Sequence, residues 1–432
     1  MPTPVKGLRW IVLAVIFLGG LVLYMLRTNL SIVSVEMMHD LGMNEYQLGL
    51  VFSSLALGYA LFQFPGGIVG DRFGPRLTIT VMAIAWTVLT VVTAIVPGVD
   101  TWAVTTIVGL LIVVRFVLGA VQAPFFPVTI GGTVERWFPV RQWGLPNGLT
   151  STGLTLGGAL TAPLLVWLME SYGWRGALLI TAPTGLIAAL TYYWFVRDDP
   201  ASHPKITASE LDFIQSDRPA IDASVEKASW KHALKNRNIL MLTGSYFCMN
   251  YVFYLFFSWF YFYLVEIRGF SASDAGLFTA AQWILGAVGA TAGGFSCDML
   301  VRHFGVHLGT RYQAMTGLIL SGLFLYLGAT ADNVTVAVVL LCCSFGFTQI
   351  TESPFWVAAM GVAGRHAQVA TGVMNTGGNF PGAVGGMMVP VIANWFGWTI
   401  AIVSSAAIVL IGALLWLLLR ADEPMVQATD VS

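Results

Sequence analysis

The sequence has 432 residues, of which 56% are hydrophobic and 10% are charged, and its formal net charge is -1. A soluble domain carries about 25% charged residues, so this composition excludes an ordinary soluble protein and indicates a polytopic protein of a lipid bilayer. The near-neutral charge gives no basis for nucleic-acid binding. Because the sequence contains no phosphate-binding loop, metal-ligand cluster or nucleophile motif, we expect no enzyme, no cofactor and no metal site.

Twelve apolar runs, each bounded by charged or turn residues, follow one another along the chain. An α-helix needs about 20 residues to cross the hydrocarbon core, and every run reaches this length. Most lysines and arginines lie in the termini and in the loops on their side, which predicts a multi-pass protein of the cytoplasmic (inner) membrane with both termini cytoplasmic. The predicted spans are 10–35, 47–69, 77–97, 103–132, 143–168, 175–196, 238–264, 274–296, 311–330, 334–360, 369–393 and 397–419.

One long polar segment, with a short helical patch around Ser209 to Asp212, divides six predicted helices from six. The two halves resemble each other in sequence. An offset of 227 residues pairs Gln122 with Gln349, and it keeps its register across several helices. Such a repeat predicts two pseudo-symmetric six-helix bundles around a central site, in an all-α fold. The predicted parts are an N-terminal bundle at 1–196, a cytoplasmic linker at 197–237 and a C-terminal bundle at 238–432.

A glycine-rich loop follows the second predicted span and reads Gly67-Ile68-Val69-Gly70-Asp71-Arg72-Phe73-Gly74-Pro75-Arg76. It resembles the signature of the major facilitator superfamily, and a degenerate copy runs from Gly294 to Arg302. The resemblance implies a gate, because a carboxylate at a helix end can bond to arginines in one conformation and release them in another. The gating residues that it implies are Gly67, Asp71, Arg72, Gly74, Arg76 and, in the second copy, Asp298.

Within that superfamily the whole chain is similar to the anion:cation symporters, a group that includes bacterial galactonate, glucarate, hexuronate and phthalate carriers. The similarity rests on the text Arg27-x-Asn29-Leu30, on Gln63-x-Pro65-Gly66-Gly67, and on Arg115 with Gln122-Ala123-Pro124-x-Phe126-Pro127. It implies alternating access around an anion site lined by Tyr24, Arg27, Tyr59, Arg115 and Asn375.

Three positions depart from that group. Leu26 and Gln122 stand where its members often carry the Asp and Glu tied to proton coupling, so the usual coupling route is absent. Leu154 stands where galactonate-type carriers have a glutamine that touches sugar hydroxyls. This difference argues against a polyhydroxylated substrate.

Two arginines inside predicted spans indicate an anion site without reference to the resemblance. No Asp or Glu in the N-terminal half shares the depth of Arg27 and Arg115. Two guanidinium groups in low dielectric are costly, and a mono- or dianion would offset that cost by bidentate bonding. The alternative is that Arg27 snorkels to the headgroups, and the second arginine favours an anion site. Helix faces and the internal repeat add Gln122, Tyr254 and Gln349 to the expected site.

Glu352 is the one ionisable residue of the predicted span 334–360, and no other carboxylate lies so deep in either half. A buried glutamate without a partner can take up and release a proton in the physiological range. We therefore expect Glu352 to replace the coupling site lost at Leu26 and Gln122. The alternative is a salt bridge with Arg365 or a loop lysine at the cytoplasmic rim.

These observations predict a monomeric secondary active transporter that takes up a small organic anion by proton symport. The anion would be a carboxylate, a dicarboxylate, a sugar acid or a sulfonate-bearing acid. Two alternatives stay open at this point: an uncoupled or other-ion-driven anion carrier, and a transporter-like anion receptor without net flux.

Overall fold

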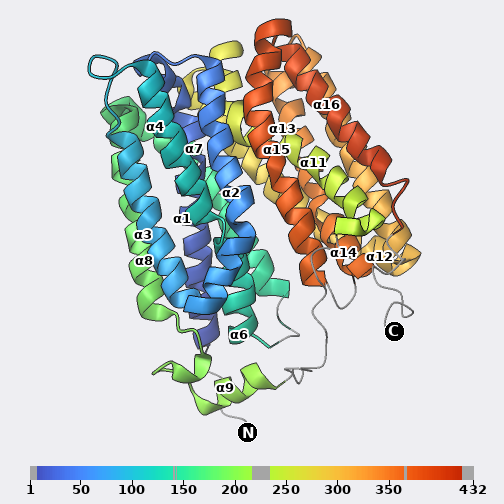
Figure 1. Cartoon of the computed structure of the whole chain (residues 1–432). Helices are drawn as coiled ribbons and strands as arrows, with labels where there is room; N and C mark the ends of the chain where they lie inside the picture. The colour runs from blue at the N-terminus through green and yellow to red at the C-terminus, as the bar shows by residue number, and fades with distance from the viewer. Residues whose placement is uncertain (1–6, 140–141, 143, 217–233, 364–366, 421–432) are drawn as a thin grey trace. The chain divides into compact units, whose positions relative to one another are not determined.

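The computed structural model describes residues 7–139, 142, 144–216, 234–363 and 367–420, and within these ranges it contains helices and no β-strand (Figure 1). The chain divides into two compact units. Unit 1 comprises Met1–Gly42 and Gly58–Val225, and unit 2 comprises Met43–Leu57 and Glu226–Ser432. The second helix therefore contributes its first part to unit 2 and the rest to unit 1.

Most of the helices in each unit are long and mostly apolar. Unit 1 contains α1 (Leu8–Asp40), α2 (Glu45–Phe73, shared with unit 2), α3 (Pro75–Ala94), α4 (Val104–Gln122), α5 (Phe125–Pro127), a π-helix (Val128–Val134), α6 (Glu135–Trp137), α7 (Gly144–Thr181), α8 (Pro183–Phe195) and α9 (Ala208–Gln215). Unit 2 contains α11 (Arg237–Phe262), a π-helix (Tyr263–Ile267), α12 (Ala272–Thr330), α13 (Val334–Ile350), α14 (Glu352–Ala363), α15 (Ala367–Phe396) and α16 (Trp398–Leu415).

Eight described helical runs are long and apolar enough to cross a membrane, or nine if the two parts of α2, bent by 55°, count as one span. Two of the runs, Leu145–Phe195 and Ala272–Thr330, are 51 and 59 residues long, about twice the length of one span. Gly173 and Gly305 divide them with φ angles of 63° and 76°, which glycine adopts without a Cβ clash. Divided there, and counted together with α15, the described helices give the twelve predicted spans, and the all-α fold is confirmed.

The fourth and tenth predicted spans are present as Val104–Trp137 and Val334–Ala363, and each contains a short interruption that the sequence analysis did not predict. The fourth ends as α4 at Gln122 and resumes after a turn, and the tenth is interrupted between Ile350 and Glu352. Proline explains both breaks because it has no N–H to donate to the carbonyl four residues earlier. The 227-residue offset pairs Pro127 with Pro354, so the break belongs to the repeated unit.

Side chains from a neighbouring helix satisfy the carbonyl groups at these breaks. In unit 2, Pro354 cannot donate to the Ile350 carbonyl, and Gln313 Nε2 donates to it at 3.1 Å. In unit 1, Trp86 Nε1 donates to the Val121 carbonyl at 3.2 Å. Buried carbonyls in a bilayer need such partners, since lipid offers none. The breaks are therefore built into the fold, one beside Gln122 and one beside Glu352.

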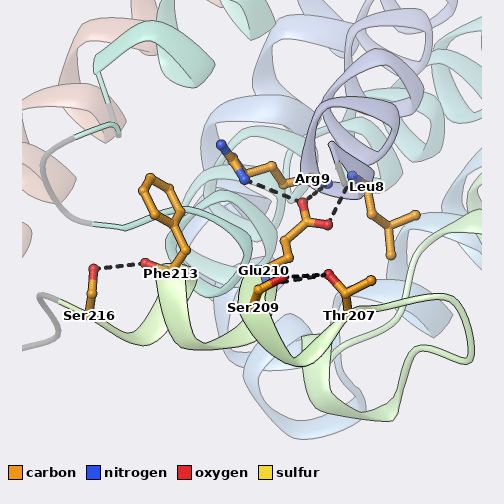
Figure 2. Close-up of polar contacts among 7 residues, drawn as sticks. All are labelled: Leu8, Arg9, Thr207, Ser209, Glu210, Phe213 and Ser216. Carbon is orange, nitrogen blue, oxygen red and sulfur yellow. Dashed lines mark hydrogen bonds and ion pairs between the residues drawn. The ribbon is translucent and has the colours of Figure 1, made fainter. Parts of the chain in front are cut away.

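The predicted helical patch after the sixth span is confirmed as α9, which lies against the start of α1 in unit 1 (Figures 1 and 2). The Glu210 carboxylate is fully buried and accepts the N–H groups of Leu8 and Arg9 at 3.2 and 3.1 Å. It also receives Arg9 Nη1 at 3.4 Å, and the Arg9 guanidinium lies 4.6 Å from the ring centre of Phe213. The first N–H groups of a helix lack internal partners and carry partial positive charge, so the carboxylate stabilises the start of α1.

We expect Glu210→Ala to lower the free energy of unfolding by about 3 kcal/mol, because it leaves a buried guanidinium and two N–H groups without their acceptor. Thermal unfolding can be followed with a thiol-reactive dye, since Cys248, Cys297 and Cys342 are buried. Asp212→Ala, which removes an exposed carboxylate of the same helix, is the matched control. Equal melting temperatures for the two variants would show that the Glu210 contact does not stabilise the protein.

Candidate functional site

Arg27 lies on α1 in unit 1 and is only 4% exposed. Its guanidinium carbon is 3.9 Å from the ring centre of Tyr59 on α2 and 5.6 Å from that of Tyr24, one turn earlier on α1. The negative faces of the two rings stabilise the cation in a low-dielectric surrounding. The structure thus brings together three of the predicted site residues.

Arg115 on α4 is fully buried. Its Nη1 donates to Asn29 Oδ1 at 3.2 Å, whereas its Nε and Nη2 have no hydrogen-bond partner within the described residues. In the same part of the chain no carboxylate forms an ion pair with it. An unpaired buried guanidinium is costly, and an anion that reaches it would satisfy two donors at once.

Gln122 is the last residue of α4, two turns after Arg115, and it is fully buried beside the helix break. Neither its amide oxygen nor its amide nitrogen has a hydrogen-bond partner among the described residues, and the same holds for Nδ2 of Asn29. Unit 1 therefore buries polar atoms of Arg115, Asn29 and Gln122 that have no hydrogen-bond partner within the described residues. The sequence analysis noted Asn29 in the motif Arg27-x-Asn29 and missed its contact with Arg115, because the two residues are 86 positions apart.

In unit 2, α11 and α15 place Tyr254 and Asn375 close together. Tyr254 Oη donates to Asn379 Oδ1 at 2.9 Å, and Asn379 Nδ2 donates to the Asn375 carbonyl at 2.7 Å and to its Oδ1 at 3.2 Å. Asn379 is thus the link between two predicted site residues. Gln349, in the last turn of α13, is half-buried and makes no hydrogen bond with this group among the described residues.

Glu352 is half-buried and is the first residue of α14, directly after the helix break. Its Oε1 accepts two hydrogen bonds, from Tyr246 Oη on α11 and from Trp356 Nε1, each at 2.8 Å. The expectation that this carboxylate has no partner was therefore wrong, because the side chains of Tyr246 and Trp356 are neutral donors to it. Within the described residues Glu352 has no cationic partner, and Arg365 lies outside them.

The residues of the glycine-rich loop lie where α2 ends and α3 begins. Asp71 and Arg72 are exposed, and in the described part of the chain Asp71 forms no ion pair. Gly74 has a φ angle of 81° and permits the turn into α3. Gly67 has open space beside it. In unit 2, the equivalent Asp298 is exposed on α12.

Arg76, the last residue of that loop, is bound by Tyr193 in the last turn of α8 and by Asp198, which follows that helix. Its N–H donates to Asp198 Oδ1 at 2.7 Å, its Nε donates to the Tyr193 carbonyl at 2.8 Å, and its guanidinium carbon lies 4.0 Å from the Tyr193 ring centre. Asp198 thereby caps α3 as Glu210 caps α1. The sequence analysis missed Asp198, because a charged residue in a polar linker gives no sign of such a contact.

Comparison with known proteins agrees with this architecture. A family model described as Major Facilitator Superfamily matches residues 16–386. The "Probable sulfoacetate transporter SauU" of Cupriavidus necator is 32% identical over 98% of this chain and 97% of its own length. The "Hexuronate transporter" of Bacillus subtilis is 30% identical over 87% and 83% of the two chains, and a "D-galactonate transporter" of Escherichia coli is 29% identical over 96% of each.

Among solved structures, a bacterial homologue of the human lysosomal transporter Spinster superposes with a TM-score of 0.78. It covers 96% of this chain and 97% of its own, at 17% sequence identity, and so supports the fold alone. The family match spans most of the chain, and the relatives of about 30% identity are transporters of organic anions. The chain therefore belongs to the Major Facilitator Superfamily and to its organic-anion transporters, as its motifs predicted.

Proposed function

We propose that the protein is a proton symporter that takes up a small organic anion across the cytoplasmic membrane by alternating access, with both termini cytoplasmic. The observation that carries this proposal is Arg115, fully buried, with two guanidinium nitrogens lacking a partner and no carboxylate paired to it within the described residues. A carboxylate or sulfonate matches the planar fork of arginine. Arg27, which lies close to the rings of Tyr24 and Tyr59, supplies a second positive charge in the same unit.

The substrate class that we propose is a short carboxylate or sulfonate with few hydroxyl groups. Relatives are named for sulfoacetate, hexuronate and galactonate, which share an anionic group and differ in their hydroxyls. In this chain Leu154 of α7 lies against Gly20 of α1. A Cβ added at Gly20 would be 3.3 Å from Leu154 Cδ2. An apolar side chain at this point offers no partner to a sugar hydroxyl, which favours a substrate of the sulfoacetate kind.

For movement and coupling, we propose Asp71 and Arg72 as the gate and Glu352 as the proton site. Asp71 is exposed near the end of α2, where Gly67 has open space beside it and Gly74 permits the turn into α3, and Asp298 holds the equivalent place in unit 2. Glu352 is held by two neutral donors, which allow either the ionised or the protonated carboxyl group to persist.

The substrate class can be tested with purified protein in proteoliposomes. We expect saturable uptake of labelled sulfoacetate, and we expect unlabelled sulfoacetate to compete at concentrations at least about tenfold lower than galactonate or glucuronate, which corresponds to 1.4 kcal/mol. Protein-free liposomes give the background. Stronger competition by galactonate would overturn the substrate class, and saturable binding without uptake would favour a receptor over a transporter.

A further inference from the structure

Three polar side chains on α11 follow one another at four-residue spacing, and the first of them contacts Glu352 while the last contacts an asparagine of α15. Tyr246 Oη donates to Glu352 Oε1 at 2.8 Å, and Asn250 Nδ2 donates to the Tyr246 carbonyl at 3.0 Å. One turn further, Tyr254 Oη donates to Asn379 Oδ1 at 2.9 Å. Residues four apart lie on one face of a helix, so these contacts form a single stripe.

The backbone of α15 packs directly on the two tyrosine rings of this stripe. Gly378 lies on Tyr246 and Gly382 lies on Tyr254, and at both glycines a Cβ would overlap the ring. The two glycines are themselves one helical turn apart, so the rings and the glycines match in register. Because no side chain separates them, a reorientation of the Tyr246 ring must displace this part of α15. Asn379, the next residue after Gly378, would move with it.

We propose that Tyr246 is a positioning residue that transmits the protonation of Glu352 to Asn375 and Asn379, and thereby sets the affinity of unit 2 for the substrate. The inference rests on the proposed proton site. An ionised carboxylate accepts strong hydrogen bonds from both Tyr246 and Trp356, whereas a protonated carboxyl group is a weaker acceptor. Protonation therefore loosens the bond that holds the Tyr246 ring against α15.

The surroundings of Glu352 leave Tyr246 as the titratable group that faces it from α11. From α12, the uncharged Gln313 lies at the break, and the nearby Arg311 donates to the Leu419 carbonyl. The last two turns of α13 and the whole of α15 contain no ionisable residue. Among the described residues of these elements, Tyr246 is therefore the titratable group that both bonds to Glu352 and packs on α15.

The experiment measures the number of protons taken up when sulfoacetate binds, by calorimetry in buffers of different ionisation enthalpy. Tyr246→Phe keeps the ring against Gly378 and removes the hydroxyl. We expect the wild type to take up close to one proton per sulfoacetate, and Tyr246→Phe to take up less than about a third of that with an affinity within about threefold at high pH. Tyr251→Phe is the matched control, because Tyr251 is a buried tyrosine of the same helix whose hydroxyl does not contact Glu352.

The outcomes separate this inference from the proposed coupling. A wild type that takes up no proton overturns the proton site itself. If the wild type takes up a proton, Glu352→Gln does not, and Tyr246→Phe behaves like the wild type, the proton site stands and the role of Tyr246 is refuted. If Tyr246→Phe fails to fold, Tyr254→Phe is the second variant. It removes the hydroxyl that donates to Asn379 Oδ1, and it is expected to show the same loss of proton uptake. Undiminished proton uptake in that variant equally refutes the inference.

Discussion

Proteoliposomes containing the Arg115→Gln variant are expected to take up sulfoacetate at less than about 1% of the wild-type rate. Loss of one partner of a buried, charge-assisted contact costs about 2–5 kcal/mol, and 2.7 kcal/mol corresponds to a hundredfold. The same variant should unfold at a temperature no lower than the wild type. In the ligand-free protein Arg115 keeps a buried charge with two nitrogens unpaired within the described residues, so its removal relieves a cost.

This combination of lost transport and retained stability distinguishes a substrate-binding arginine from a structural one. Arg175 is the control, because it donates to the carbonyls of Ala94 and Val96 and pairs with Asp40 at 3.3 Å. Arg175→Gln should therefore lower the unfolding temperature and leave the uptake rate of the folded fraction near that of the wild type. If Arg115→Gln instead melts early and its folded fraction still transports, Arg115 serves the fold and the anion site lies elsewhere.

The fold could be predicted from the sequence because a bilayer constrains the chain so strongly. A run of about 20 apolar residues has one stable form in lipid, and glycines such as Gly173 and Gly305 separate consecutive runs. The interruptions at Gln122 and Glu352 could not be read in the same way. Proline is tolerated in membrane helices whenever a neighbour satisfies the released carbonyl. Here Gln313, 37 positions away, donates to the Ile350 carbonyl that Pro354 releases, and Trp86, 35 positions away, donates to the Val121 carbonyl at the other break.

The candidate site was predictable by residue type and not by partner. Charged and amide groups in apolar runs are conspicuous, so Arg27, Arg115 and Glu352 stood out. Each of them also has a contact on another helix that its own sequence surroundings do not reveal, and Tyr246, the partner of Glu352, is one of many aromatic residues on α11. The linker shows the same limit, since Glu210 looks like a solvated residue of a polar segment and is in fact fully buried beneath α1.

Glu352→Gln is expected to abolish the accumulation of sulfoacetate driven by a pH gradient and to preserve counterflow exchange between equal concentrations on the two sides. Glutamine keeps an oxygen that can accept the hydrogen bonds of Tyr246 and Trp356, so the packing of α11 on α14 is retained. It cannot take up a proton. The carrier would therefore still change conformation with substrate bound, while the proton gradient would no longer drive net movement.

Asp332→Asn is the matched control, since it neutralises an exposed carboxylate of unit 2 outside the proposed proton site, and it should accumulate sulfoacetate like the wild type. Accumulation by Glu352→Gln at the wild-type level would assign proton coupling to another group. If the wild type itself ignores the pH gradient and responds to a sodium gradient or to none, the protein is driven by another ion or is a facilitator. In that case the hydrogen bonds to Glu352 stabilise the break between α13 and α14, and Glu352→Ala, which removes their acceptor, should unfold at a lower temperature without a change in transport rate.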